Sequence, residues 1–158
     1  GKALAYAGLK IGKEVSWLPS YGPEMRGGTS NCSVVVSDKP VASPIISAPD
    51  ILIAMNKPSL AKFESRVKPG GCIIVNSSLI ETKVKRTDVK VYYVDANDLA
   101  LKAGNAKTAN IVVLGAYTKI SGVFTPEVMK AVIEKKFAKK AKVIPANFAA
   151  FDLGYDLE

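Results

Sequence analysis

Histidine is absent from this chain of 158 residues. The chain therefore has no Ser-His-Asp or Cys-His nucleophile arrangement and no metal site built on histidine, because each of these needs an imidazole. Lys, Asp, Glu or Tyr can still act as catalysts, but the commonest general base is missing. This absence makes it less plausible that the polypeptide carries out chemistry alone.

Cysteine is almost as scarce, since Cys32 and Cys72 are the only two. They form no CxxC motif, so the sequence indicates neither a zinc site nor an iron–sulfur site. Each lies beside a β-rich apolar stretch, SVVV or IIV. We therefore expect both to be small buried hydrophobic residues that stay reduced.

Long apolar runs are missing as well. No run approaches the ~18 to 20 residues of a membrane span, and no signal peptide is visible. A hydrophobic content of 48% with 23% charged residues is typical of a folded domain with a substantial core. Without an internal repeat or a linker, residues 1–158 are expected to form one domain, cytoplasmic and not membrane-associated.

Positive charge is in excess, at a net +8. Such an excess suggests an anionic partner, which can be nucleic acid, a phosphorylated cofactor or an acidic protein. Much of it lies in KVKR (83–86) and EKKFAKKAK (134–142). We interpret the second stretch as the solvated C-terminal end of a helix, where lysine also suits the helix dipole. Phe137 is the only aromatic residue among those lysines, so a surface for stacking bases is not indicated.

Apolar patterning alternates between strands and helices along the chain. Runs rich in Val, Ile and Tyr predict strands at 14–18, 32–37, 50–55, 72–76 and 90–94. Helical periodicity and capping residues predict helices at 1–11, 57–67, 99–104, 125–137 and in the tail after 142. TANIVVLGAY fits a strand or a helix, and the following KISG favours a helix. Because several strands are continuous apolar runs, with 32–37 expected to be central, we predict an α/β three-layer sandwich: a mostly parallel, mixed sheet with helices on both faces.

The loop PSYGPEMRGG (19–28) contains a charged pair and three glycines, more than a loop that only connects two strands requires. Its glycines allow backbone N–H groups to turn toward a ligand and cup an anion, and Arg26 offers a planar fork of donors for phosphate or carboxylate. Glu24 can orient that arginine or pair with a neighbouring subunit. The candidate ligand-facing residues are Tyr21, Gly22, Glu24, Arg26, Gly27 and Gly28. An internal Glu24–Arg26 pair that pins a strand crossover is the alternative, and both stay open.

Short polar residues follow two of the predicted strands. Ligands of α/β folds lie at the carboxyl ends of strands, so Asn76, Ser77 and Ser78 are candidates for binding a phosphate or holding the Arg26 loop, with turn and capping hydrogen bonds as the alternative. Asn56 is read in the same way, as a helix cap first and a site residue second. The acids at 95 and 98 have the spacing of helix caps. Trp17 is expected in the core or at an interface.

Four stretches carry a resemblance to a known family. YGPEMRGGTSNCSVVVSD, SAPDILIAMNKPSLAKFE, KPGGCIIVNSSLI and ANIVVLGAY resemble, in order, the gamma subunit of 2-oxoacid:ferredoxin oxidoreductases. The likeness extends from about residue 3 to the C-terminal FAAFDLGY. The form EMRGG-TSNC is more similar to the 2-oxoglutarate and branched-chain 2-oxoacid (2-oxoisovalerate) enzymes than to the pyruvate enzymes. One departure is clear: the strand and GxGGQG-type loop that usually open the family are absent here.

The resemblance implies a component of an enzyme that oxidatively decarboxylates a 2-oxoacid to an acyl-coenzyme A and reduces ferredoxin. Thiamine diphosphate and Mg would belong to the alpha and beta partner subunits, and iron–sulfur clusters to these subunits or to a delta subunit. The gamma chain would hold no cofactor of its own, no catalytic residue and no metal, but would help to accommodate coenzyme A and to assemble the complex. The alternatives are a stand-alone module that binds an anionic nucleotide and, less favoured, a nucleic-acid binder.

Overall fold

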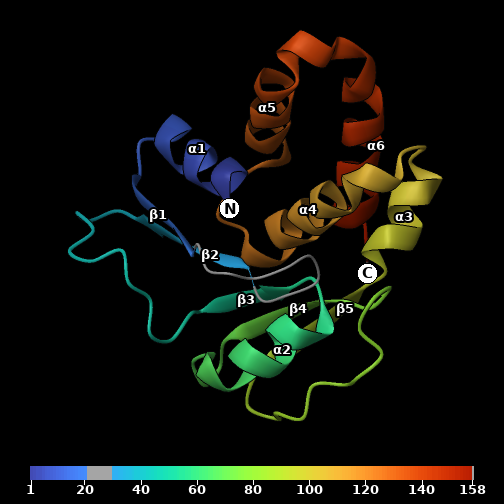
Figure 1. Cartoon of the computed structure of the whole chain (residues 1–158). Helices are drawn as coiled ribbons and strands as arrows, with labels where there is room; N and C mark the ends of the chain where they lie inside the picture. Colours follow the sequence, from blue (N-terminus) through green and yellow to red (C-terminus); the bar gives the residue numbers. More distant parts are fainter. Residues whose placement is uncertain (21–29, 158) are drawn as a thin grey trace.

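The computed structural model describes residues 1–20 and 30–157, and within them the strands form two sheets (Figure 1). An antiparallel pair consists of β1 (Glu14–Ser20) and β2 (Asn31–Ser37). A parallel sheet has the order β3-β4-β5 and consists of β3 (Ile51–Ala54), β4 (Cys72–Asn76) and β5 (Lys90–Val94). The predicted α/β class is confirmed.

Each predicted helix is present. The helices are α1 (Lys2–Lys10), α2 (Lys57–Phe63), α3 (Ala96–Lys102), α4 (Ala109–Ser121), α5 (Pro126–Lys136) and α6 (Ile144–Tyr155), with 3₁₀ segments η1 (Glu64–Arg66), η2 (Ala106–Thr108) and η3 (Ala138–Val143). The ambiguous run TANIVVLGAY lies largely in α4. It shows little helical periodicity because α4 is buried around most of its circumference.

The predicted ends of two helices follow local chemistry. Thr125 accepts a hydrogen bond from the backbone N–H of Val128 and so caps α5, with Pro126 as its first residue. Gly12 ends α1 in the left-handed conformation, at φ 77°, and donates to the carbonyl of Leu9. A side chain at this backbone angle would be strained, so glycine is the residue suited to the position.

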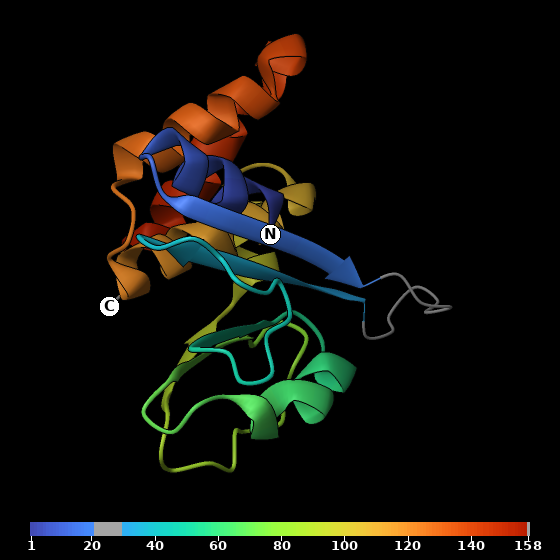
Figure 2. The ribbon, with the colours of Figure 1, turned by 90° about the vertical axis from the view of Figure 1, so that its left-hand side faces the viewer.

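Strand β4 is buried on both of its faces. Ile74 belongs to the larger hydrophobic cluster, which α1, α4, α5 and α6 build, whereas Ile73 and Val75 belong to a smaller cluster with Leu60 of α2. This alternation follows from the two-residue period of a strand. The prediction of helices on both faces of the sheet is thereby confirmed (Figure 2).

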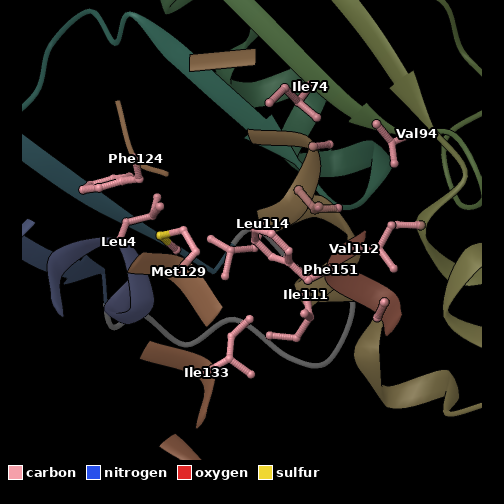
Figure 3. Packing of buried hydrophobic residues seen from close by; sticks show 14 of the residues in the cluster. Leu4, Ile74, Val94, Ile111, Val112, Leu114, Phe124, Met129, Ile133 and Phe151 are labelled. Carbon is pink, nitrogen blue, oxygen red and sulfur yellow. The ribbon is translucent and has the colours of Figure 1, made fainter. Parts of the chain in front are cut away.

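The larger cluster holds the helical layer to the sheet. Figure 3 shows how Ile74 and Val94 of the sheet point toward the same interior as side chains of four helices, labelled Leu4, Ile111, Val112, Leu114, Met129, Ile133 and Phe151. Helices α4 and α6 approach each other closely where both carry glycine. A Cβ atom at Gly154 would lie 1.9 Å from the carbonyl oxygen of Val112, and one at Gly115 would lie 2.1 Å from that of Phe151.

Two expectations about β1 and β2 are wrong. Residues 32–37 are not central, since within the described residues β2 pairs with β1 alone and its valines are half-buried. Cys32 is exposed, whereas Cys72 is buried as expected and burial raises the pKa of its thiol. Trp17 is 36% exposed, so it does not lie in the core of this chain, and its expected place at an interface stays a prediction. A β-branched run predicts a strand, but the number of its neighbours depends on tertiary packing.

We expect Gly154→Ala to destabilise the protein by at least about 2 kcal/mol, because a methyl group would force α4 and α6 apart. Helix propensity alone predicts the opposite sign, a gain of about 1 kcal/mol. Urea unfolding followed by circular dichroism measures the change. Ala149→Gly, at an exposed position of the same helix, is the control and should lose about 1 kcal/mol. A Gly154→Ala variant as stable as the parent would contradict this account of the crossing.

Candidate functional site

The carboxyl ends of β3, β4 and β5 meet at one edge of the parallel sheet. Asn76 is the last residue of β4 and lies opposite Val94 of β5, so the residues that follow the two strands are neighbours. We call Asn76, Ser77, Ser78, Asp95, Asn97 and Asp98 the strand-end cluster. Its contacts bear directly on the predicted ligand role of Asn76, Ser77 and Ser78.

Asn76 is 1% exposed, and its side-chain amide joins three segments. Its Nδ2 donates to Asn97 Oδ1 at 2.9 Å and to the carbonyl of Met55 at 3.4 Å. Its Oδ1 accepts from the backbone N–H groups of Ala96 at 3.2 Å and of Ser78 at 3.3 Å. These four bonds use both donors and both acceptor sites of the amide. The geometry therefore favours the structural interpretation of Asn76 over direct ligand binding.

Ser77 and Ser78 bond to the first turn of α3. Ser77 Oγ donates to Asp95 Oδ1. Ser78 Oγ donates to Asp98 Oδ2 and accepts from the backbone N–H of Asp98, each at 3.3 Å. Asp95 occupies the N-cap position but forms no capping bond with its own side chain. The prediction that the Asp95 side chain caps this helix is thus wrong, because Ser77 engages its carboxylate while Asn76 and Ser78 serve the helix N–H groups.

The charge of the strand-end cluster limits what it can bind. Asp95 and Asp98 are both exposed beside the serine hydroxyls. A phosphate placed on Ser77 and Ser78 would meet two carboxylates, which is electrostatically unfavourable. A hydrogen-bond donor such as a hydroxyl or an amide fits the cluster better. Coenzyme A binding by Ser77 and Ser78 stays a prediction, without support from this geometry.

Asn56 caps α2. Its Oδ1 accepts from the backbone N–H of Ser59 at 3.1 Å, and Pro58 occupies the first turn of that helix. The helix-cap interpretation is confirmed, and the additional role of lining a site stays a prediction. Tyr21, Gly22, Glu24, Arg26, Gly27 and Gly28 lie outside the described residues. The β1–β2 pair closest to that loop is Ser20 opposite Asn31.

Arg86 of the KVKR stretch has a structural role that the sequence did not indicate. Its guanidinium donates to Asp88 at 2.6 and 2.8 Å and to the backbone carbonyls of Glu64 and Val67 at 3.0 and 2.5 Å. The side-chain hydrogen bonds between Arg86 and Asp88 lower the pKa of the Asp88 carboxyl and raise the pKa of the Arg86 guanidinium. This arginine therefore ties the segment before β5 to η1 and is not simply a solvated charge.

The described residues offer little else for chemistry. Nowhere in 1–20 or 30–157 do three His, Cys, Asp or Glu side chains gather closely enough to hold a metal ion. The same residues contain no helix of the length and apolar character needed to cross a bilayer.

Comparison with known proteins defines the class of the chain. The model of the pyruvate ferredoxin/flavodoxin oxidoreductase family matches residues 1–157, so the chain belongs to this family. The gamma subunit of the keto/oxoacid ferredoxin oxidoreductase from Geobacter sulfurreducens superposes with a TM-score of 0.83 at 28% identity, over 99% of this chain and 87% of that one. The resemblance to gamma subunits indicated by the sequence motifs is confirmed.

Two further proteins of this kind are larger. The ketoisovalerate oxidoreductase subunit VorA of Methanothermobacter thermautotrophicus is 38% identical over 98% of this chain. This chain spans about a third of VorA, at 32% of its length. The 2-oxoglutarate:ferredoxin oxidoreductase of Magnetococcus marinus, solved with 2-oxoglutarate, coenzyme A and succinyl-CoA bound, shares the fold with a TM-score of 0.83 at 22% identity, over 97% of this chain and 27% of that one.

We expect Asn76→Ala to lower the free energy of unfolding by about 3 kcal/mol, because it leaves the buried N–H of Ala96, the partly buried N–H of Ser78 and the Asn97 side chain without their partner. Thermal unfolding measures the change. Asn105→Ala is the control, since Asn105 caps η2 with one exposed bond to the backbone N–H of Lys107, and it should cost about 1 kcal/mol. Equal losses for the two variants would show that Asn76 is not the central tie of the strand-end cluster.

Proposed function

We propose that the chain is the gamma subunit of a multi-subunit 2-oxoacid:ferredoxin oxidoreductase in the cytoplasm. The complete enzyme decarboxylates a 2-oxoacid oxidatively, forms an acyl-coenzyme A and reduces ferredoxin. The observation that supports this proposal most strongly is the family match over residues 1–157, together with the close superposition on a gamma subunit of similar length. The ketoisovalerate relative, at 38% identity, is consistent with the branch that EMRGG-TSNC suggests.

The gamma chain contributes to assembly and does not carry out thiamine or cluster chemistry. With no histidine and no CxxC motif, its sequence offers little for cofactor chemistry. Its partners are the alpha and beta subunits, with or without a delta subunit, and they hold the thiamine diphosphate, Mg and iron–sulfur clusters. Tyr6 and Leu9 are spaced to lie on one face of α1 and are 60% and 62% exposed. Large apolar side chains left in water suit a surface that another subunit covers.

Coenzyme A is accommodated beside this chain, at the loop between β1 and β2. Arg26 is suited to a phosphate or carboxylate group, and the adjacent glycines let backbone N–H groups approach it. The coenzyme A in the Magnetococcus marinus structure, whose fold this chain shares, is consistent with the proposal. The strand-end cluster carries two carboxylates, which would repel a phosphate. Arg26 is therefore the residue proposed to bind the phosphate groups of coenzyme A.

Reconstitution tests the subunit function. The isolated chain should show no oxidation of 2-oxoglutarate or 2-oxoisovalerate in the presence of coenzyme A, because it lacks thiamine chemistry. Adding the co-purified alpha and beta subunits should restore reduction of ferredoxin, which is followed by absorbance. If the full rate is reached without this chain, or if this chain alone binds a nucleotide and never joins the complex, a stand-alone nucleotide-binding module is the better description.

Arg26→Ala should leave assembly intact and raise the KM for coenzyme A by about tenfold or more, which is the value of a hydrogen bond to a charged group. Steady-state kinetics of the reconstituted complex measure KM, and size-exclusion chromatography checks assembly. Arg66→Ala removes the same charge from an exposed position in η1 and should change neither quantity. An unaltered KM and turnover in Arg26→Ala would mean that the loop does not face coenzyme A.

A further inference from the structure

The turn between α5 and α6 concentrates positive charge that the proposed function does not use. Residues 134–142 hold five lysines against one glutamate, which is half of the net charge of +8. We call Lys135, Lys136, Lys139, Lys140 and Lys142 the lysine turn. Figures 1 and 2 both show this turn at the end of the helical layer farthest from the parallel sheet. It is therefore a separate surface from the strand-end cluster.

The lysines of this turn are exposed and are not neutralised by neighbours. All five residues are exposed. The ion pairs among the described residues involve Lys13, Lys68, Arg86 and Lys130 and none of the five. Lys136 Nζ lies 5.5 Å from the centre of the half-buried Phe137 ring, a contact that leaves its charge in place. Their charge remains available to a partner.

The helix-end interpretation explains only two of these lysines. Lys135 and Lys136 lie in the last turn of α5, where the helix dipole favours positive charge. Lys139, Lys140 and Lys142 lie in η3, just before α6 begins. The start of α6 is the positive end of that helix, and its first turn contains no acidic residue. Three lysines therefore add to a field of the same sign, which costs the isolated chain stability.

The extent of the patch favours a surface over a single small anion. Residues 135–140 line a hollow of about 470 Å³, and the charges continue to Lys142. Nucleic acid is less suitable, since the stretch has no arginine and its one aromatic ring, Phe137, is half-buried. A spread of lysines without stacking rings suits carboxylates distributed over a protein.

We propose that the lysine turn docks an acidic protein surface, a patch of Asp and Glu side chains on a partner protein. Its attraction is long-range and screened by salt, so it steers association more than it holds the complex. The inference goes beyond the proposed function and does not depend on it, because the charges belong to this chain whatever enzyme it joins. Its test measures binding and not turnover, so the two proposals can fail separately.

The test uses the full chain and two labelled probes, a peptide rich in Asp and Glu and a single-stranded oligonucleotide of equal net charge. Fluorescence anisotropy at about 50 mM salt, where screening is weak, gives the dissociation constants. Changing Lys135, Lys136, Lys139 and Lys140 together to Gln should raise the constant for the peptide about tenfold or more. Circular dichroism confirms that the variant is folded.

The matched control removes the same charge elsewhere, through Gln at Lys10, Lys39, Lys102 and Lys107, which are all exposed. A change below about twofold in this control supports a local docking surface. An equal loss in both variants would show a response to net charge alone and overturn the proposal. Tighter binding of the oligonucleotide, lost in the lysine-turn variant, would make nucleic acid the partner. If the peptide does not bind, or if the lysine-turn variant binds it equally well, the proposal is wrong and the lysines are simply solvated charges at a helix end.

Discussion

Burial of β4 on both faces is the constraint on which the rest of the structure depends. Ile74 packs into the cluster built by α1, α4, α5 and α6, while Ile73 and Val75 pack against α2. Five consecutive residues without a solvent-facing side must be satisfied entirely inside the protein. Asn76, the last residue of the strand, is polar, and its buried amide has to form all its hydrogen bonds with neighbouring protein groups. The hydrogen bonds of the strand-end cluster meet this requirement.

The sequence was most informative where a local signal decides the structure. Thr125 followed by Pro126 predicts the start of α5 because capping acts within one turn. Strands 72–76 and 90–94 were predicted with their observed bounds because glycine, proline and polar residues delimit the apolar runs. The alternation of strands and helices likewise predicted the α/β class and helices on both faces of the sheet.

Where partners come from distant segments, the sequence predicted less. CSVVVS looked central, yet β2 pairs with β1 alone among the described residues, and Cys32 is exposed in consequence. Asn76, Ser77 and Ser78 were recognised as polar residues after a strand, but their bonds to Asn97, Asp95 and Asp98 depend on the register of β4 and β5. No single-chain pattern gives that register, because parallel strands are joined through a long connection. The structural role of Arg86 was not predicted for the same reason, because its carbonyl partners at Glu64 and Val67 belong to a distant segment.

The strand-end cluster and the lysine turn differ in whether their side chains have hydrogen-bond or ion-pair partners within the described chain. At the strand-end cluster each aspartate accepts from a serine hydroxyl and Asn76 has no unused hydrogen-bonding group, so folding alone explains why these residues are there. At the lysine turn, Lys139, Lys140 and Lys142 repel one another and add to the positive end of α6, so folding alone does not favour these three. Since these three lysines cost the isolated chain stability, the acidic partner proposed above would account for their presence.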